Sequence, residues 1–327
     1  MKKVSMAELF SIKDKTVTHN KLTNEPIMLS RRKKVTELID FYPEIDVDYV
    51  FPTVKETIEG KEISPTKAML IAIETGSTAL LYGPHGCGKT TLIEQICARL
   101  NIPIIRVQHT EGMEPSQIFG ETQAGPDGTF FEPALLPLAM SAGAVYLADE
   151  YDRATNGITS EYQAILEGKP LIMPHVPLDK DGKSWRKVEP HKNFCFIATG
   201  NTNGQGDETG NYMGVQIGNV ANYSRFGMTV KMDWIKPDDE IKILIKKAKI
   251  HVETATSLVI VANKIRDGKA KAANITVAPS TRELLAIADL GMKFASMNAA
   301  FKIGYSNRLP LGQAQAADQI FKTVVGE

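Results

Sequence analysis

From about residue 45, short runs of apolar residues alternate with longer stretches in which apolar residues recur every three or four positions. Because polar residues seldom interrupt the short runs, we expect strands that are buried on both faces, as in a largely parallel sheet covered by helices. The alternation of strand and helix signals therefore predicts an α/β layer fold. The five predicted strands are Thr78–Tyr82, Ile104–Gln108, Ala144–Ala148, Phe194–Thr199 and Met228–Met232.

After Trp234 the pattern is helical throughout. Apolar residues recur at i, i+3, i+4 and i+7 over residues 241–248 and again over residues 258–265. Ser280 and Glu283 form an S-x-x-E capping box, which predicts that a helix begins there. We therefore expect an α/β core over residues 45–235 and a helical lid domain over residues 236–327.

The first 44 residues form a polar arm with one short helix expected around Val35–Phe41. The arm contains a basic run, Arg31–Lys34. Such a run is typical of a solvated surface, and the alternative is a contact with nucleic acid or with a partner.

The composition and charge of the chain disfavour several classes of function. Of the 327 residues, 43% are hydrophobic and 23% charged, as in ordinary globular proteins. Lys and Arg number 38, as do Asp and Glu, so a dominant attraction for nucleic acid or an anionic membrane is not expected. The three cysteines show no C-x-x-C spacing, and there is no long apolar run or apolar leader. These features favour a cytoplasmic protein without a zinc site or a disulfide framework.

Residues 83–90 read GPHGCGKT, which matches the phosphate-binding pattern G-x-x-x-x-G-K-[ST]. A predicted strand leads into this loop and an apolar helix face follows it. Glycines let backbone N–H groups face a phosphate, and the positive end of the helix faces the same anion. Lys89 is expected to reach the β- and γ-phosphates, and the Thr90 hydroxyl to bind Mg²⁺. The predicted ATP-binding residues are Gly83, Pro84, His85, Gly86, Cys87, Gly88, Lys89, Thr90 and Thr91.

The position of Cys87 in this loop leads to a further expectation. A thiol beside Lys89 and a helix N-terminus should have a lowered pKa. We therefore expect alkylation of Cys87 to block nucleotide binding, and bound ATP to protect the thiol.

A second element is the apolar strand that ends in Asp149 and Glu150. In a P-loop protein the first carboxylate would bind Mg²⁺, directly or through water, and the second would activate the attacking water. The alternative is an acidic strand end that merely faces solvent.

Three further polar residues follow predicted strands or begin predicted helices. Asn201 would hydrogen-bond the attacking water or the γ-phosphate, or else serve only in a turn. Arg225 suits bidentate contact with phosphate, or else forms a surface ion pair. Arg282 lies in the first turn of a predicted lid helix, where it would face nucleotide or solvent.

In this order the elements resemble an AAA+ ATPase of the MoxR type, and most of all the ATPase subunit of aerobic cobaltochelatase (CobS type). The likeness spans about residues 45–327. Beyond the generic motifs it is carried by Asp48–Phe51, Ala148–Asp152, Asn201–Gly210, Ala300–Lys302 and Ser306–Arg308.

The resemblance implies a P-loop AAA+ core with a five-stranded, mostly parallel sheet and a C-terminal helical lid. It implies Walker A at Gly83–Thr90, Walker B at Asp149 and Glu150, sensor 1 at Asn201, an arginine finger at Arg225 and sensor 2 at Arg282. Because the finger acts on the ATP of a neighbour, the resemblance also implies a ring, usually a hexamer.

MoxR-type proteins carry two β-hairpin inserts, and residues 111–132 and 171–192 occupy those places here. Turn residues occur in both, at Gly125–Gly128 and Asp179–Gly182. Phe130 and Phe131 would line a pore, or else close a small satellite core. The chain departs from relatives at Ser224, where Asp is common, and at Phe226, where Trp is frequent.

Together these features predict Mg²⁺-dependent ATP hydrolysis by a ring-forming motor that remodels a partner protein, such as a metal chelatase or a von Willebrand A-domain protein. Two alternatives remain at this stage. One is a nucleic-acid-associated AAA+ motor, and the other is a nucleotide-gated scaffold with negligible turnover. The sequence names no client.

Overall fold

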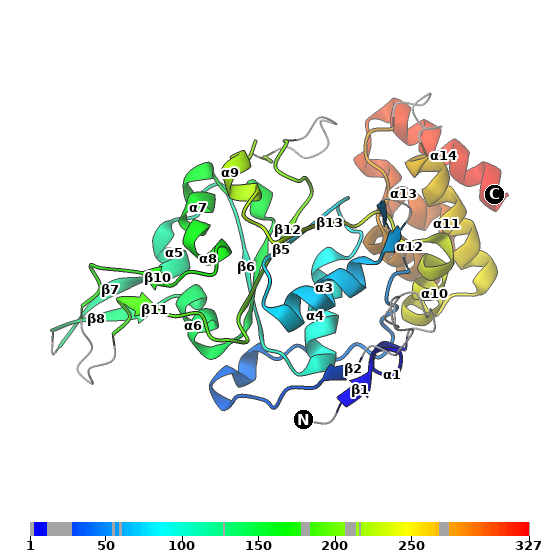
Figure 1. Ribbon diagram of the computed structural model, residues 1–327. Helices are drawn as coiled ribbons and strands as arrows, with labels where there is room; N and C mark the ends of the chain where they lie inside the picture. The colour runs from blue at the N-terminus through cyan, green and yellow to red at the C-terminus, as the bar shows by residue number, and fades with distance from the viewer. Residues whose placement is uncertain are drawn as a thin grey trace. The chain divides into compact units, whose positions relative to one another are not determined.

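The structure is a computed structural model, and it describes residues 3–11, 28–53, 56–58, 61–126, 128–177, 184–206, 214–215, 217–267 and 275–326 (Figure 1). The chain divides into two compact units. The first comprises Met1–Ile45, Lys55–Gly83 and Lys89–Met232, and the second comprises Asp46–Val54, Pro84–Gly88 and Asp233–Glu327.

A five-stranded parallel sheet is the centre of the first unit. Its strands have the order β13-β5-β12-β9-β6, and every neighbouring pair is parallel. Every residue of β9 and β12 is buried, which explains why these segments are apolar without alternation. The five predicted strands and the α/β fold are thus confirmed. The strands are β5 (Ala79–Tyr82), β6 (Ile104–Gln108), β9 (Val145–Asp149), β12 (Cys195–Gly200) and β13 (Met228–Lys231).

Helices cover both faces of this sheet (Figure 1). On one side lie α3 (Pro65–Thr75) and α4 (Lys89–Leu100), and on the other lie α5 (Pro115–Phe119), α6 (Leu135–Ala142), α7 (Asn156–Glu161) and α8 (Gln163–Leu166). The helix predicted after the phosphate-binding loop is α4, and its predicted apolar face is buried. Helix α6 ends because Gly143 adopts a left-handed conformation and donates its N–H to the carbonyl of Ala139.

Two small hairpins fall in the segments where inserts are expected. One consists of β7 (Gly120–Gly125) and β8 (Gly128–Pro133), and the other of β10 (Leu171–Ile172) and β11 (Lys187–Val188). Residues of both hairpins line one cavity of about 440 Å³. Phe131 packs against the hydrophobic core while Phe130 is 45% exposed, so the two phenylalanines face different surroundings. The predicted turn residues Asp127 and 179–182 lie outside the described residues.

The arm contains β1 (Lys3–Ser5), α1 (Met6–Phe10), β2 (Met28–Ser30) and the 3₁₀ helix η1 (Thr36–Phe41). Much of its basic run is engaged within the chain. The Arg32 guanidinium donates to the carbonyls of Ile73 and Asn193, at 3.3 and 3.2 Å, and Arg31 donates to the Asn101 side chain at 3.1 Å. These contacts give Arg31 and Arg32 a structural role without any nucleic acid.

The second unit is helical, as its periodicity predicts. Its core joins residues of each of the described α-helices, including the stacked rings of Phe301 and Phe321, whose centroids lie 4.5 Å apart. Among the helices of the described residues, none combines the length and the apolar character needed to cross a bilayer. The helices are α10 (Pro237–Ala248), α11 (Val252–Arg266), α12 (Thr281–Phe294), α13 (Met297–Gly304) and α14 (Leu311–Val325), with the 3₁₀ helix η4 (Ser306–Arg308). The hairpin of β3 (Glu56–Ile58) and β4 (Lys61–Ile63) belongs to the first unit.

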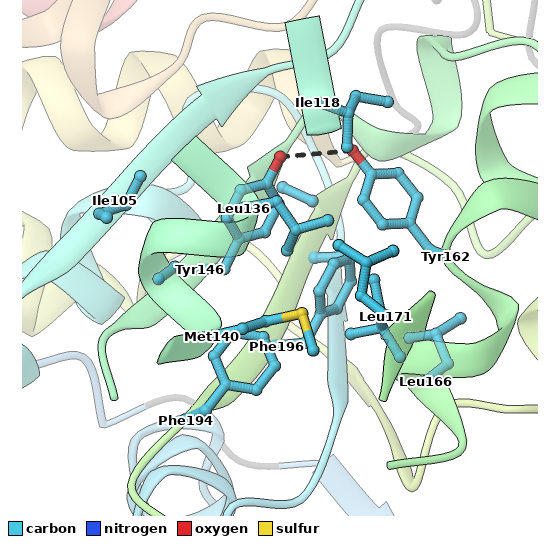
Figure 2. Close-up of a cluster of buried hydrophobic side chains, with 14 of the residues drawn as sticks. Ile105, Ile118, Leu136, Met140, Tyr146, Tyr162, Leu166, Leu171, Phe194 and Phe196 are labelled. Atoms are coloured by element: carbon cyan, nitrogen blue, oxygen red, sulfur yellow. Dashed lines mark hydrogen bonds between the residues drawn. The ribbon is translucent and has the colours of Figure 1, made fainter. Parts of the chain in front are cut away.

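Polar side chains are hydrogen-bonded to one another within the core of the first unit, where Figure 2 shows the bond between Tyr146 and Tyr162. The His109 ring donates from Nδ1 to the carbonyl of Val107 at 3.1 Å, because a carbonyl oxygen can only accept. His109 Nε2 then accepts from the Tyr162 hydroxyl at 2.7 Å, and the Tyr162 oxygen accepts from Tyr146 at 3.3 Å. Because the pKa of His109 is lowered to about 4, the ring is neutral near pH 7, and these contacts then require its proton to be on Nδ1.

The neutral state of His109 predicts a loss of stability in acid. Burial lowers the pKa of His109 from 6.5 to about 4, against the opposing effect of its hydrogen bond to Val107. The unfolded chain takes up a proton below pH 6.5 that the folded chain refuses, so stability falls as the pH drops from 6.5 to 4. The shift corresponds to about 3 kcal/mol of unfolding free energy. Urea unfolding from pH 7 to pH 4 measures it.

A matched variant isolates this contribution. His109→Gln carries no titrating ring, so its unfolding free energy should fall less steeply over the same pH range than that of the wild type. Parallel pH profiles for the two proteins would show that His109 does not titrate as described.

Candidate active site

The loop between β5 and α4 has a backbone that only glycine accommodates. Gly83, Gly86 and Gly88 have φ angles of +156°, +75° and +94°. A Cβ atom on Gly83 would lie 1.8 Å from the carbonyl oxygen of Met232. The pattern G-x-x-x-x-G-K-[ST] is therefore required by local geometry here, and it presents the start of α4 to an anion.

Lys89, the first residue of α4, lies across this loop. Its Nζ donates to the carbonyl of Gly83 at 2.8 Å and to Oδ1 of Asn201 at 3.3 Å. Asn201 directly follows β12, the sheet neighbour of β5. The structure thus brings together two residues that the sequence predicts for phosphate binding, from positions 112 residues apart.

Thr90 and Asp149 also meet. The Thr90 hydroxyl donates to Oδ1 of Asp149 at 2.9 Å, and the Thr199 hydroxyl donates to the same oxygen. The other carboxylate oxygen, Oδ2, accepts from Arg106 Nε at 2.8 Å and from its terminal nitrogen at 2.6 Å. Burial raises the pKa of Asp149, but the hydrogen bond from Thr199 and the Arg106 charge outweigh it, and the net pKa is lowered. Asp149 is therefore a carboxylate at neutral pH, as a metal ligand must be.

Glu150 follows β9 in a left-handed backbone conformation, with φ +55°. This conformation is uncommon for a residue with a side chain, and it turns the chain sharply after Asp149. Glu150 Oε2 accepts from Gln108 at 3.1 Å and from Arg153 at 2.9 Å. The side chain is 25% exposed, so solvent water reaches it.

Arg225 has its contacts elsewhere in the first unit. It follows the short helix α9 (Val220–Tyr223), and its Nε donates to Glu167 Oε1 at 2.7 Å. The next residue, Phe226, is buried and packs edge-on against Tyr151 at a centroid distance of 5.6 Å. Phe226 thus anchors the segment while Arg225 remains partly exposed, with 28% of its side chain accessible.

Arg282 is exposed in the first turn of α12. The predicted capping box is confirmed, since Glu283 Oε2 accepts from the Ser280 N–H at 2.6 Å and Ser280 Oγ accepts from the Glu283 N–H at 3.4 Å. A Cβ on Gly86 would lie 2.4 Å from the Cβ of Ser280. The start of α12 therefore lies directly against residues 84–88 of the loop, which belong to the same unit.

A buried ion pair fixes this helix start. Both Glu240 oxygens accept from the Arg266 guanidinium, at 2.7 and 2.9 Å, and the two side chains are 0% and 2% exposed. Glu240 also accepts from the Thr281 hydroxyl at 2.7 Å, and Arg266 donates to the carbonyl of Pro279. Such a pair is costly to break, because either partner alone would be a buried charge.

One expectation concerned the Cys87 thiol, which was expected to be alkylated and to be protected by bound ATP. Its side chain is completely buried. A reactive cysteine needs solvent access as well as a positive environment, and Cys87 lacks the first. The loop motif alone gives no indication of which way its middle residues point.

Several residues that contact the candidate site are not apparent from the motifs. Arg106 and Gln108, which contact Asp149 and Glu150, lie two residues apart on β6 and therefore on one face of that strand. One indication of these two residues was present in the sequence, since Arg106 and Gln108 are a cation and an amide within an otherwise apolar strand. Arg153 and Asp152 follow the acidic pair in the short 3₁₀ helix η2 (Tyr151–Arg153).

Comparison with known proteins agrees with this geometry. Residues 78–213 match the family model of the AAA domain (dynein-related subfamily), and residues 240–318 match the CbbQ/NirQ/NorQ C-terminal model. The chain is 28% identical to the aerobic cobaltochelatase subunit CobS of Sinorhizobium sp, over 82% of this chain and 78% of CobS. The chain is an AAA+ ATPase of the MoxR type.

Two other relatives of this AAA+ ATPase share most of its length. Protein CbbQ of Hydrogenophilus thermoluteolus is 27% identical over 63% of this chain and 71% of CbbQ. Protein NorQ of Paracoccus denitrificans is 22% identical over 75% of this chain and 83% of NorQ. The likeness thus includes both the AAA domain and the helical C-terminal part.

The residues present fit the nucleotide that an AAA+ ATPase binds. The glycines of the loop adopt positive φ angles that let its backbone approach a phosphate closely, and Lys89 supplies a positive charge beside it. Thr90 and Asp149 together offer a hydroxyl and a carboxylate oxygen, the donor types that Mg²⁺ prefers.

Proposed function

We propose that this AAA+ ATPase binds ATP with Mg²⁺ and hydrolyses it at the interfaces of a ring, usually a hexamer, in order to remodel a partner protein. The observation that carries the proposal is the convergence of Lys89 with Asn201, beside Thr90 with Asp149, at the ends of neighbouring parallel strands. In open α/β sheets, ligands bind at this end of the strands.

Each residue then has a distinct role. Lys89 would hold the β- and γ-phosphates, and Thr90 and Asp149 would hold Mg²⁺, which offsets phosphate charge when bound. Glu150 would accept a proton from the attacking water, and Asn201 would orient that water or the γ-phosphate. Arg225 would act on the ATP of the neighbouring subunit, and Arg282 would sense the γ-phosphate from the lid.

A protein partner is supported by the relatives. CobS is described as a subunit of aerobic cobaltochelatase, so it works beside other chains. For this chain we propose a partner of the same kind, a chelatase subunit or a von Willebrand A-domain protein. The nucleic-acid alternative has less support, since Arg31 and Arg32 are already engaged within the chain.

Phosphate release by the purified protein tests this function. We expect turnover that requires Mg²⁺, is lost in EDTA and is not stimulated by double-stranded DNA. Mass photometry with ATP should show a ring-sized particle. Stimulation by DNA that falls steeply with salt would favour the nucleic-acid motor instead.

Arg106 is expected to set the Mg²⁺ requirement. Its guanidinium donates two hydrogen bonds to Asp149, so it competes with a metal ion for that carboxylate. Two unit charges about 4 Å apart repel by about 4 kcal/mol near a protein surface. Because half of the Arg106 side chain is exposed, screening reduces this effect. We expect Arg106→Gln to lower the Mg²⁺ concentration needed for nucleotide binding about tenfold, or about 1.4 kcal/mol.

Titration of Mg²⁺ against a fluorescent ATP analogue measures this shift without turnover. Arg153→Gln is the matched control, since Arg153 contacts Glu150 instead of Asp149. An unchanged or increased Mg²⁺ requirement in Arg106→Gln would contradict the competition.

A further inference from the structure

Asp152 is a buried carboxylate three residues after Asp149. It lies in η2, and the residue is 2% exposed. Its Oδ2 accepts from the N–H groups of Asn201 and Thr202, at 2.7 and 2.9 Å, and from the Thr202 hydroxyl at 3.3 Å. Asp152 thus joins the turn after Glu150 to the end of β12.

The hydrogen bonds from the Asn201 and Thr202 N–H groups to Asp152 hold the backbone of Asn201, whose side chain contacts Lys89. They fix the main chain of Asn201 and Thr202 where β12 ends, and Asn201 Oδ1 lies 3.3 Å from Lys89 Nζ. A Cβ at Gly200 would lie 3.2 Å from Cγ of Asp152, a tight contact in which the neighbour would have to yield by a few tenths of an ångström. The approach of the two segments is therefore tight and specific.

Burial of the Asp152 carboxylate lowers the free energy of unfolding. The second oxygen, Oδ1, is buried, and within the described part of the chain it has no hydrogen-bond partner. Burial raises the pKa of Asp152, and the N–H bonds from Thr202 and Asn201 offset this only in part. A buried polar atom without a partner costs about 1–3 kcal/mol, so the two backbone hydrogen bonds of Asp152 are kept at a cost in stability.

We propose that Asp152 is a positioning residue, which holds the Asn201 backbone so that the Asn201 side chain meets Lys89 and the terminal phosphate of ATP. The role rests on the proposed function, because Asn201 matters only where ATP is hydrolysed. Asp152 accepts its hydrogen bonds from Asn201 and Thr202. It acts through Asn201 and links the Glu150 turn to the phosphate-sensing strand end.

Enzyme kinetics and nucleotide binding together test this role. In Asp152→Ala we expect kcat to fall about 10- to 100-fold, while the Kd for a fluorescent ATP analogue changes less than about threefold, because Lys89 and the loop remain. Asp152→Asn should restore most of the rate, since its carboxamide oxygen accepts the same two N–H bonds. Thr202→Val is the matched control, and it should be near wild type because only the hydroxyl bond is lost.

A double-mutant cycle separates positioning from general structure. If Asp152 acts through Asn201, then Asp152→Ala should have little further effect on kcat in an Asn201→Ala background. Additive losses, or equal losses of binding and thermal stability without rescue by Asn, would overturn the proposal. Asp152→Ser provides the same cycle if the alanine variant does not fold. A wild type without turnover would overturn the proposed function itself, and the positioning role with it.

Discussion

Glu150→Gln is expected to bind ATP as the wild type does and to hydrolyse it about 10²- to 10⁴-fold more slowly, the usual contribution of a general base. Glutamine has the shape of glutamate and keeps an oxygen that can accept from Gln108 and Arg153, as Glu150 Oε2 does. The substitution therefore removes basicity and little else. Phosphate release measures kcat, and a fluorescent ATP analogue measures binding.

The control for this variant is Glu189→Gln. It makes the same chemical change at a carboxylate that is 61% exposed and pairs with Lys187. Its turnover should match the wild type. Near wild-type turnover in Glu150→Gln would show that Glu150 is not the base, whereas weakened ATP binding would mean that the site itself has been disturbed.

The strands and the loop were predictable because their causes are local. β9 and β12 are buried on both faces, so their sequences are continuous apolar runs. The start of α12 is set within the four residues Ser280–Glu283, whose first and last members are the two partners of a capping box. The loop motif is a set of backbone requirements, as the positive φ angles of Gly83, Gly86 and Gly88 show.

Contacts that depend on strand order were not predictable from one sequence. Gln108 lies opposite Asp149 only because β6 and β9 are neighbours in register, and Arg106 reaches Asp149 from the same face. Nothing local specifies that pairing. The burial of Cys87 and the contact between Gly86 and Ser280 likewise depend on packing between segments far apart in the chain.

For Asn201 the sequence left two interpretations, a turn residue or a phosphate sensor. The contact with Lys89 supports the second, and it arises because β12 lies beside β5. For Arg225 the structure shows an ion pair with Glu167 in its own chain. That contact alone would fit the surface ion pair that the sequence also allowed, so Arg225 needs a functional test.

Arg225→Ala is expected to lower kcat about 10³- to 10⁵-fold, as loss of an arginine finger does in well-studied GTPases. The reason is that the guanidinium would offset charge that develops on the transferred phosphate. ATP binding to the isolated subunit should remain, because Lys89 and the loop supply it. Turnover and nucleotide binding of the variant, measured side by side, check both expectations.

Mixing two inactive proteins decides whether Arg225 acts between subunits. Lys89→Ala lacks the phosphate-binding lysine but keeps Arg225, and Arg225→Ala has the opposite lesion. In a ring that combines them, an intact site forms wherever a subunit that keeps Lys89 lies next to a subunit that keeps Arg225. Part of the turnover should therefore return. Glu167→Gln is the control for the ion pair, and it should retain activity because it frees Arg225, along with Lys169, from a partner in the same chain. A mixture no more active than its components would argue against action in trans, and full activity of Arg225→Ala would leave this arginine as a surface ion pair.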